Sequence, residues 1–201
     1  MPQPLLLIIS GPPCAGKTTI GRWLAGKLRL PLFSRDAFKE TLFDSLGWSD
    51  LEWSQRLGGA SYALLYHTAE ALLAAGCSLI VESNFDPQYD TQRLRDLAAR
   101  CPFCPLQLRC MAAGPVLFER FKQRVMSGAR HPGHRDELNI AVYEPVAREG
   151  AGPRNDFLDI GGERIDIDTT DFAALDYGLI LGRVHDAIAR LDQPEQRAAG
   201  R

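Results

Sequence analysis

A short glycine-rich motif near the N-terminus constrains the fold of this 201-residue chain more than any other feature. Residues 11–18 read GPPCAGKT and match the pattern G-x-x-x-x-G-K-[ST] at every fixed position. The motif directly follows an apolar run at residues 5–9, and it directly precedes residues 17–30, where apolar side chains recur at helical spacing. The sequence therefore predicts a buried strand, a tight glycine corner and a helix in immediate succession.

A strand, a glycine corner and a helix in this order favour phosphate binding. Glycines let the backbone curl so that successive N–H groups point at phosphate oxygens, and the start of the helix adds partial positive charge. Lys17 is expected to bridge the β- and γ-phosphates of a nucleoside triphosphate, and the Thr18 hydroxyl to bind Mg²⁺. The residues expected to contact the nucleotide here are Gly11, Pro12, Pro13, Cys14, Ala15, Gly16, Lys17, Thr18 and Thr19.

The rest of the chain alternates short apolar runs with amphipathic stretches. Further strands are expected at residues 31–34, 78–82, 106–111 and 163–168, and helices at 35–46, 54–75, 89–100, 115–126, 139–148 and 176–191. Strands that alternate with helices favour an α/β fold with a parallel sheet and helices on both faces. We expect one domain over residues 1–191, with a lid at about 127–137, and a polar tail at 192–201.

Composition and charge narrow the possible partners. A hydrophobic content of 45% allows an ordinary core, and a net charge of -2 gives no overall attraction to nucleic acid or anionic membrane, so neither long nucleic acid nor a membrane is expected as a partner. The apolar run at residues 5–9 is too short for a signal peptide or a membrane span, which favours the cytoplasm. Cys101 and Cys104 have the spacing of half a zinc site, but no second pair follows, and we expect ordinary thiols.

Asp36 is the candidate general base. The carboxyl ends of parallel strands meet at one edge of a sheet, where ligands bind. Asp36 follows the second expected strand, so it would face the same crevice as Lys17. A carboxylate there can accept the proton of an attacking hydroxyl and orient it. The same position also fits an acid that caps a helix or lies in its first turn.

Two further polar residues follow the third expected strand. Glu82 could hold the hydration shell of Mg²⁺, or it could be a solvated acid at the end of a strand. Asn84 could orient the substrate, or it could simply form a turn.

A basic segment lies between the fourth and the last expected strands. Arg120 and Arg124 are four residues apart and share a helix face, and Arg130 follows in the expected lid. A lid of arginines would stabilise charge on the transferred phosphoryl group and exclude water. We therefore expect Arg124 and Arg130 to act in catalysis with Lys17, and Arg120 and Arg124 to contact the nucleotide. The alternative is a solvated basic helix with acidic neighbours such as Asp136.

The motifs GPPCAGKTT, SRDAFK, LIVESNF and IDIDTTD, together with the arginine-rich lid, resemble those of small P-loop kinases of the polynucleotide-kinase, zeta-toxin and chloramphenicol-phosphotransferase type, an AAA-type ATP-binding family. The resemblance implies a three-layer P-loop NTPase sandwich with strand order 2-3-1-4-5. It also implies Asp36 as the base, Lys39 as a phosphate or substrate contact, and an adenine pocket near Asp168 and Thr169. The family has arginine where this chain has Lys39, so bidentate geometry is lost there.

These observations predict a kinase that transfers the γ-phosphate of MgATP to a hydroxyl group of a small molecule, nucleoside or sugar. ATP is preferred because the chain has no Asn-Lys-x-Asp guanine motif. Two alternatives stay open, a 5′-hydroxyl polynucleotide kinase and an ATPase module without an acceptor. The aromatic residues at positions 48–66 could stack on the acceptor or belong to the core.

Overall fold

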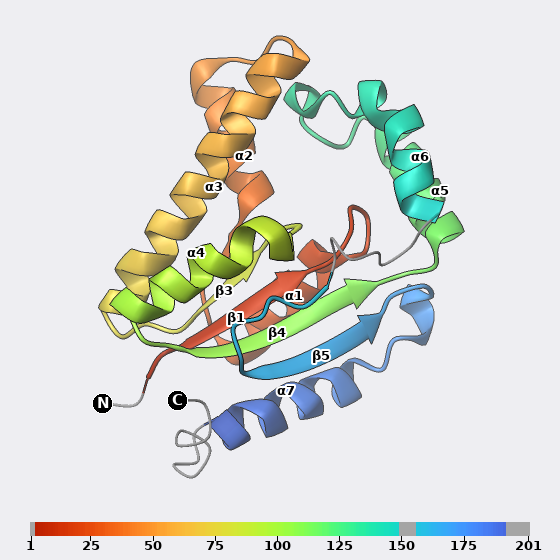
Figure 1. Cartoon of the computed structure of the whole chain (residues 1–201). Helices are drawn as coiled ribbons and strands as arrows, with labels where there is room; N and C mark the ends of the chain where they lie inside the picture. The colour runs from red at the N-terminus through yellow and green to blue at the C-terminus, as the bar shows by residue number, and fades with distance from the viewer. Residues whose placement is uncertain (1–2, 149–155, 192–201) are drawn as a thin grey trace.

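The computed structural model describes residues 3–148 and 156–191, so the expected tail at 192–201 lies outside the described residues. Five strands, β1 to β5, form one parallel sheet in the order β2-β3-β1-β4-β5 (Figure 1). The strands are β1 Leu5–Ser10, β2 Leu32–Ser34, β3 Leu79–Glu82, β4 Cys104–Met111 and β5 Glu163–Asp168. This is the strand order that the resemblance implied, and it confirms the P-loop NTPase fold.

The helices between the strands form crossovers, and the last helix follows β5. They are α1 Lys17–Leu28, α2 Arg35–Leu46, α3 Leu51–Ala74, α4 Pro87–Arg100, α5 Gly114–Ser127, α6 Ile140–Arg148 and α7 Tyr177–Leu191. The bounds of α2 and β5 are those expected from the sequence, and α3 begins three residues earlier than expected because Asp50 caps it by accepting a hydrogen bond from the Trp53 amide at 2.8 Å. In the described parts of the chain, no helix combines the length and the apolar character that a bilayer crossing requires.

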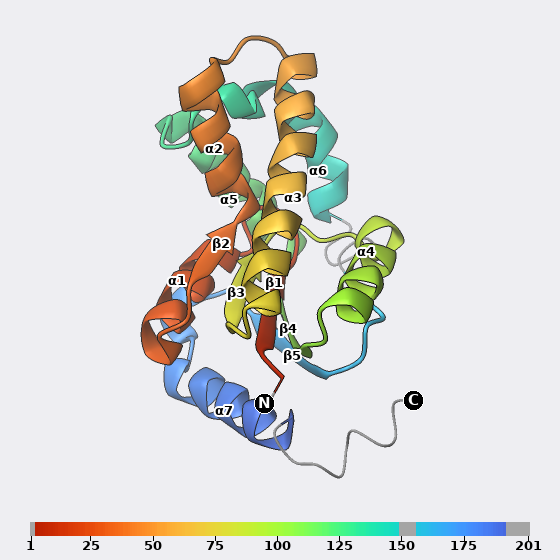
Figure 2. The same cartoon turned by 90° about the vertical axis from the view of Figure 1, so that its left-hand side faces the viewer.

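The central strand β1 is buried on both faces, which explains its continuous apolar sequence. Leu7 and Ile9 point into a cluster with α1, α5, α6 and α7, whereas Leu6 and Ile8 point into a second cluster with α3 and α4. Helices α1 and α7 therefore cover one face of the sheet, and α3 and α4 cover the other (Figure 2). Because successive side chains of a strand face opposite ways, one apolar run supplies both halves of the core.

Two pairs of helices extend past the carboxyl ends of the strands. Helices α2 and α3 form one wall, and α5 and α6 form the other (Figure 1). The expected lid at 127–137 joins these walls, but it is not a plain loop. It begins with the last residue of α5 and contains a 3₁₀ turn at Pro132–His134 and the start of another, Asp136–Asn139.

The lid packs directly on α2. Gly133 stands so close to the Phe43 ring that a Cβ atom there would lie 2.7 Å from it, and the His131 ring stacks on Phe43 with a centroid distance of 5.0 Å. The buried His134 ring also meets Phe43 edge-on at 5.3 Å. We call residues 131–134 the lid turn. These contacts fix the lid turn against α2, so that the lid residues on either side of the turn lie over the carboxyl ends of the strands.

Candidate active site

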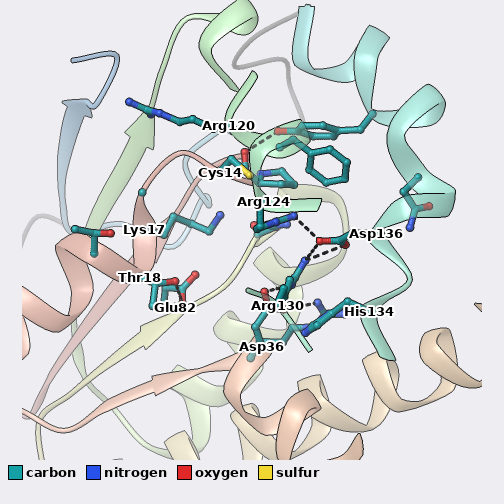
Figure 3. A pocket seen from close by; sticks show the side chains of 18 of the residues that line it. Cys14, Lys17, Thr18, Asp36, Glu82, Arg120, Arg124, Arg130, His134 and Asp136 are labelled. Carbon is teal, nitrogen blue, oxygen red and sulfur yellow. Dashed lines mark hydrogen bonds and ion pairs between the residues drawn. The ribbon is translucent and has the colours of Figure 1, made fainter. Parts of the chain in front are cut away.

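A cavity of about 590 Å³ lies at the carboxyl end of the sheet, between the two helical walls (Figure 3). It is lined by Pro13, Cys14, Gly16, Lys17, Thr18, Thr19, Arg35, Asp36, Lys39, Glu82, Asn84, Arg120, Phe121, Arg124, Arg130, His134, Asp136, Asn139, Val142, Tyr143 and Phe172. Nine sequence-predicted residues outside the glycine-rich loop were expected around one site, and seven of them line this cavity. The other two, Asp168 and Thr169, do not.

The glycine-rich loop has the backbone that its sequence requires. Gly11 has a φ of 134° and packs against β4, where a Cβ atom would lie 2.1 Å from the Cys110 carbonyl oxygen. Gly16 has a φ of 78° and faces the Phe172 ring, which a Cβ atom would approach to 2.1 Å. Larger side chains would therefore clash at both positions, besides straining the backbone. The glycine-rich loop and the segment after β5 therefore pack tightly against each other at Gly16 and Phe172.

Lys17 is buried, with 6% of its surface exposed, at the floor of the cavity. Its Nζ donates to the Pro12 carbonyl at 2.8 Å. Burial lowers the pKa of this ammonium, and the nearby Glu82 carboxylate opposes the shift. A buried cation whose hydrogen bond within the described residues goes to a neutral carbonyl is well placed to bind an anion such as a phosphate group.

Thr18 and Glu82 place oxygen atoms side by side next to Lys17. The Thr18 Oγ1 donates to Glu82 Oε2 at 3.1 Å, and Glu82 is buried at the end of β3 (Figure 3). A hydroxyl and a carboxylate are the oxygen ligands that Mg²⁺ prefers, usually together with phosphate and water. No group of three or more candidate ligands among His, Cys, Asp and Glu occurs in the described residues.

Asp36 lies in the first turn of α2 and faces the cavity. Its carboxylate is ion-paired with Arg130 of the lid and with Arg35 Nη1, the latter at 2.9 Å. Ser34 is the residue at the cap position of α2, so Asp36 does not cap the helix. Burial acts to raise the pKa of the Asp36 carboxyl, but Arg130 and Arg35 outweigh it and hold this pKa well below its usual range. The carboxylate is therefore ionised and can accept a hydrogen bond from a hydroxyl group.

Arg124 and Arg130 meet at an acid that the sequence reasoning did not select. Asp136 accepts from Arg124 Nη2 at 2.9 Å and from Arg130 Nη1 at 2.9 Å, and its side chain is mostly buried (Figure 3). The sequence analysis named Asp136 as an acidic neighbour of a solvated helix. An acid at the end of an arginine-rich segment, next to Glu137, was the available signal, and only the fold shows that Asp136 joins α5 to the lid.

Arg120 and the segment after β5 line the other end of the cavity. The Arg120 Nη2 donates to the carbonyl oxygens of Thr169 and Thr170 at 2.8 and 3.1 Å, and its guanidinium lies 4.6 Å from the centroid of the Phe172 ring. The Thr169 hydroxyl is buried and bonded to the Ala15 carbonyl at 2.9 Å. Thr169 therefore braces the loop from behind, and Asp168 is bonded to the Thr170 amide at 2.8 Å outside the cavity.

Phe172 and Tyr143 are cavity residues that the sequence did not indicate. Phe172 covers Gly16, and the Tyr143 hydroxyl of α6 donates to the Pro13 carbonyl at 2.6 Å. Each is an aromatic residue in an amphipathic or turn segment, a pattern typical of core residues. Each of them contacts a residue of the glycine-rich loop that lies more than 100 positions away in the sequence. Local sequence patterns do not indicate contacts of this kind.

Lys39 and Asn84 line the side of the cavity nearest to α3, together with Arg35. Lys39 donates to the Ser54 hydroxyl of α3 at 2.9 Å. The aromatic residues of α3 do not line the cavity. Tyr62 and Tyr66 are half-buried; the Tyr62 hydroxyl accepts from Ser83 Oγ at 3.0 Å, and the Tyr66 hydroxyl donates to Asp90 Oδ1 at 2.7 Å. Tyr66 packs against the core cluster with α3 and α4.

Comparisons with known proteins agree with this fold. The model of the AAA domain family matches residues 6–145. A protein of Chloroflexus aurantiacus J-10-fl, provisionally assigned as a kinase, is 45% identical, and the match covers 92% of this chain and 98% of that one with a TM-score of 0.84. A search of curated proteins finds no match.

Two more distant structures share the fold. A gluconokinase from Sinorhizobium meliloti is 14% identical over the full length of both chains, with a TM-score of 0.51. An APS kinase from Mycobacterium tuberculosis, solved with AMPPNP and APS, is 15% identical over 94% of this chain and 99% of that one, with a TM-score of 0.51. The chain belongs to the AAA domain family and has the fold of the small P-loop kinases.

Proposed function

We propose that this protein is a kinase that transfers the γ-phosphate of MgATP to a hydroxyl group of a small molecule, nucleoside or sugar. The observation that carries the proposal is the shared cavity of Lys17 and Asp36, a phosphate-binding lysine and an ionised carboxylate that come from different crossovers. A nucleotide switch has no need of a carboxylate that activates an acceptor. The relatives whose names say kinase support the same reaction class.

The residues divide into the roles that phosphoryl transfer requires. The backbone N–H groups of the glycine-rich loop, to which Pro12 and Pro13 contribute none, hold the triphosphate together with Lys17. Asp36 accepts a hydrogen bond from the acceptor hydroxyl and takes its proton. The acceptor oxygen forms a bond to the γ-phosphorus as the bond to the β,γ-bridging oxygen breaks. Arg124 and Arg130 can donate to the oxygens of the transferred group. Thr18 and Glu82 would hold Mg²⁺, which neutralises charge on the β- and γ-phosphates when it is bound.

An ATP-consumption assay with and without candidate hydroxyl compounds tests this proposal. Stimulation by one of them, with a phosphorylated product, would support transfer, whereas acceptor-independent hydrolysis would support an ATPase module. Stimulation by 5′-hydroxyl oligonucleotides that falls steeply with salt would favour a polynucleotide kinase instead.

Two variants make the assay specific for the site. Lys17→Ala should abolish transfer. Asp36→Asn should retain ATP binding and lose about 10²- to 10⁴-fold in kcat, the usual contribution of a general base. Full turnover by the Asn variant would remove Asp36 from the mechanism.

A further inference from the structure

The carboxylate of Asp36, which the proposed reaction needs, is occupied by two arginines. Its Oδ1 accepts from Arg35 Nη1 at 2.9 Å, and its Oδ2 accepts from Arg130 Nη2 (Figure 3). Burial acts to raise the pKa of this carboxyl, and Arg130 is the largest of the charges that lower it. A carboxylate with a guanidinium group on each oxygen is a poor proton acceptor. The arrangement therefore blocks the role proposed for Asp36.

Arg130 is shared between two carboxylates on different elements. Its Nη2 is bound to Asp36 of α2, while its Nη1 donates to the two oxygens of Asp136 at 3.1 and 2.9 Å. Asp136 also accepts from Arg124 Nη2 at 2.9 Å, so one acid holds both arginines. Because the contacts to Asp136 use Nη1 alone, Nη2 can change its partner while Asp136 keeps hold of the side chain.

The charge of Arg130 reaches the glycine-rich loop. Burial raises the pKa of the Cys14 thiol in this loop, and Arg130 is among the charges that oppose the rise. Arg130 also lines the same cavity as Lys17. A phosphate group bound at Lys17 would therefore compete with Asp36 for Arg130. It is the stronger partner, because it carries more negative charge and more acceptor oxygens than a carboxylate.

The backbone between Arg130 and Asp136 is fixed by the lid turn. The Gly133 amide donates to His131 Nδ1 at 3.0 Å, and the His134 Nε2 lies 3.0 Å from Glu40 Oε1 of α2. These contacts, with the packing on the Phe43 ring, hold residues 131–134 against α2. A rotation of the Arg130 side chain is therefore enough to change its partner, and the lid as a whole can stay in place.

We propose that Arg130 exchanges its partner when ATP binds: it leaves Asp36 for the γ-phosphate, while Asp136 keeps hold of it as a positioning residue. Asp36 is then released to accept the acceptor hydroxyl only when ATP is in place. ADP has no γ-phosphate, so loss of that group by transfer returns Arg130 to Asp36. This inference rests on the proposed kinase function and adds the condition under which the base works.

Equilibrium binding of AMPPNP and of ADP to the full chain, each with Mg²⁺, tests the exchange without an acceptor. The ratio of the ADP and AMPPNP dissociation constants measures the contribution of the γ-phosphate. Asp36→Asn removes the competitor for Arg130, so AMPPNP should bind about 5-fold or more tightly than to wild type, within the range of coupling between neighbouring groups. The affinity for ADP should stay within about 2-fold. No gain in AMPPNP affinity would refute the exchange.

The same substitution in the Arg130→Met background separates the exchange from direct repulsion between Asp36 and the phosphate. Without Arg130 there is no ion pair to break, so Asp36→Asn should affect AMPPNP affinity less than it does when Arg130 is present. An equal or larger effect would mean that direct repulsion explains the gain, and the exchange would be refuted.

Asp136→Asn tests the positioning role. It leaves Arg130 to Asp36 alone, so the ratio of the ADP and AMPPNP dissociation constants should fall about 5-fold or more, and Asp136→Glu should restore most of it. Loss of a negative charge by itself would raise the ratio, and a general loss of folded structure would lower both affinities together. Glu137→Gln removes an exposed acid of the same 3₁₀ turn and is the matched control, with a ratio within about 2-fold of wild type. An unchanged or raised ratio in Asp136→Asn would refute the positioning role.

Crystal structures of wild type give a test that needs no variant. With Mg²⁺ and AMPPNP, Arg130 should contact the γ-phosphate and lie away from Asp36, whereas with Mg²⁺ and ADP the pair with Asp36 should remain. An intact pair in both structures would overturn the inference and leave the kinase proposal standing. None of these measurements depends on turnover. If no hydroxyl compound is phosphorylated, the kinase proposal fails, and the binding results still decide whether Arg130 changes its partner.

Discussion

Replacing Lys39 with methionine should make the ligand-free protein more stable near neutral pH. Burial, with help from the nearby Arg35 guanidinium, lowers the pKa of the Lys39 ammonium from its ordinary value of 10.5 to about 8. The fold thus disfavours the charged form of this side chain. Methionine has a similar length and no charge, so it removes the unfavourable interaction while it fills the same space between α2 and α3.

The size of the effect follows from the pKa shift. A pKa unit corresponds to about 1.4 kcal/mol, so the whole shift would correspond to about 3 kcal/mol. Relaxation of the surroundings and water entering the cavity lower the cost of burying the ammonium, which reduces the expected gain to about 1–2 kcal/mol. Loss of the hydrogen bond to Ser54 takes back up to about 1 kcal/mol. The free energy of unfolding at pH 7 should therefore rise by about 1 kcal/mol.

The pH dependence of the stability difference gives a sharper test than its size at pH 7. A lysine with a lowered folded-state pKa destabilises the fold fully below about pH 8 and not at all above pH 10.5. Between these pH values the unfolded chain binds more protons than the folded protein does. The stability of wild type therefore increases relative to that of Lys39→Met as the pH rises. The charged groups near Lys39 are Arg35, Asp36, Arg130 and Asp136. The pKa of Asp36 is lowered and that of Arg130 is raised, so neither group changes charge between pH 7 and 10.

Equilibrium urea unfolding of wild type and Lys39→Met at pH 7 and pH 10 measures both quantities. The matched control is Lys27→Met, which removes an exposed lysine of α1. The stability difference between Lys39→Met and wild type should shrink by about 1 kcal/mol over this range. The control should differ from wild type by a constant few tenths of a kcal/mol. If Lys39→Met is less stable than wild type at pH 7 by the same amount as at pH 10, the lysine is a structural residue and its charge is already balanced.

The remaining predictions concern the lid and the glycine-rich loop. Arg124→Ala and Arg130→Ala should each lower kcat at least 100-fold with a smaller change in KM, measured by steady-state kinetics, and if neither does so the lid plays no part in transfer. Gly133→Ala should clash with the ring beneath the lid turn, costing about 1–3 kcal/mol of stability and about 10-fold in kcat, whereas Gly182→Ala on α7, where a Cβ atom has free space, should cost neither. Tyr143→Phe should weaken ATP binding a few-fold in calorimetry through loss of its bond to the loop, and unchanged affinity would uncouple α6 from the nucleotide.

The fold was predictable because its signals are local. The apolar run of β1 reports burial on both faces, the glycines report a tight corner, and the alternation of strands and helices reports parallel crossovers. The bounds of α2 and β5 matched expectation for the same reason. The strand order came from the resemblance and is confirmed by the sheet.

The lid was the hardest part to predict. Its arginines were recognised from spacing and position, but its two 3₁₀ turns and its packing on Phe43 were not. Asp136 was not predicted as a site residue, because an acid beside arginines in a sequence is equally consistent with a solvated ion pair. Arg124, Arg130 and Asp36 come together only because the lid that follows α5 packs against α2.

The sequence by itself therefore determined that this chain has a phosphate-binding corner between a buried strand and a helix, within a parallel α/β sheet. Tertiary structure decided which charges meet there: Asp36 shares the cavity of Lys17, and Asp136 joins Arg124 of α5 to Arg130 of the lid. It also buries Lys39 against α3, where the described residues form no ion pair with it. The reason is physical. Backbone conformation and burial follow from neighbours along the chain, whereas the electrostatic state of a side chain depends on groups that only folding brings within a few ångströms.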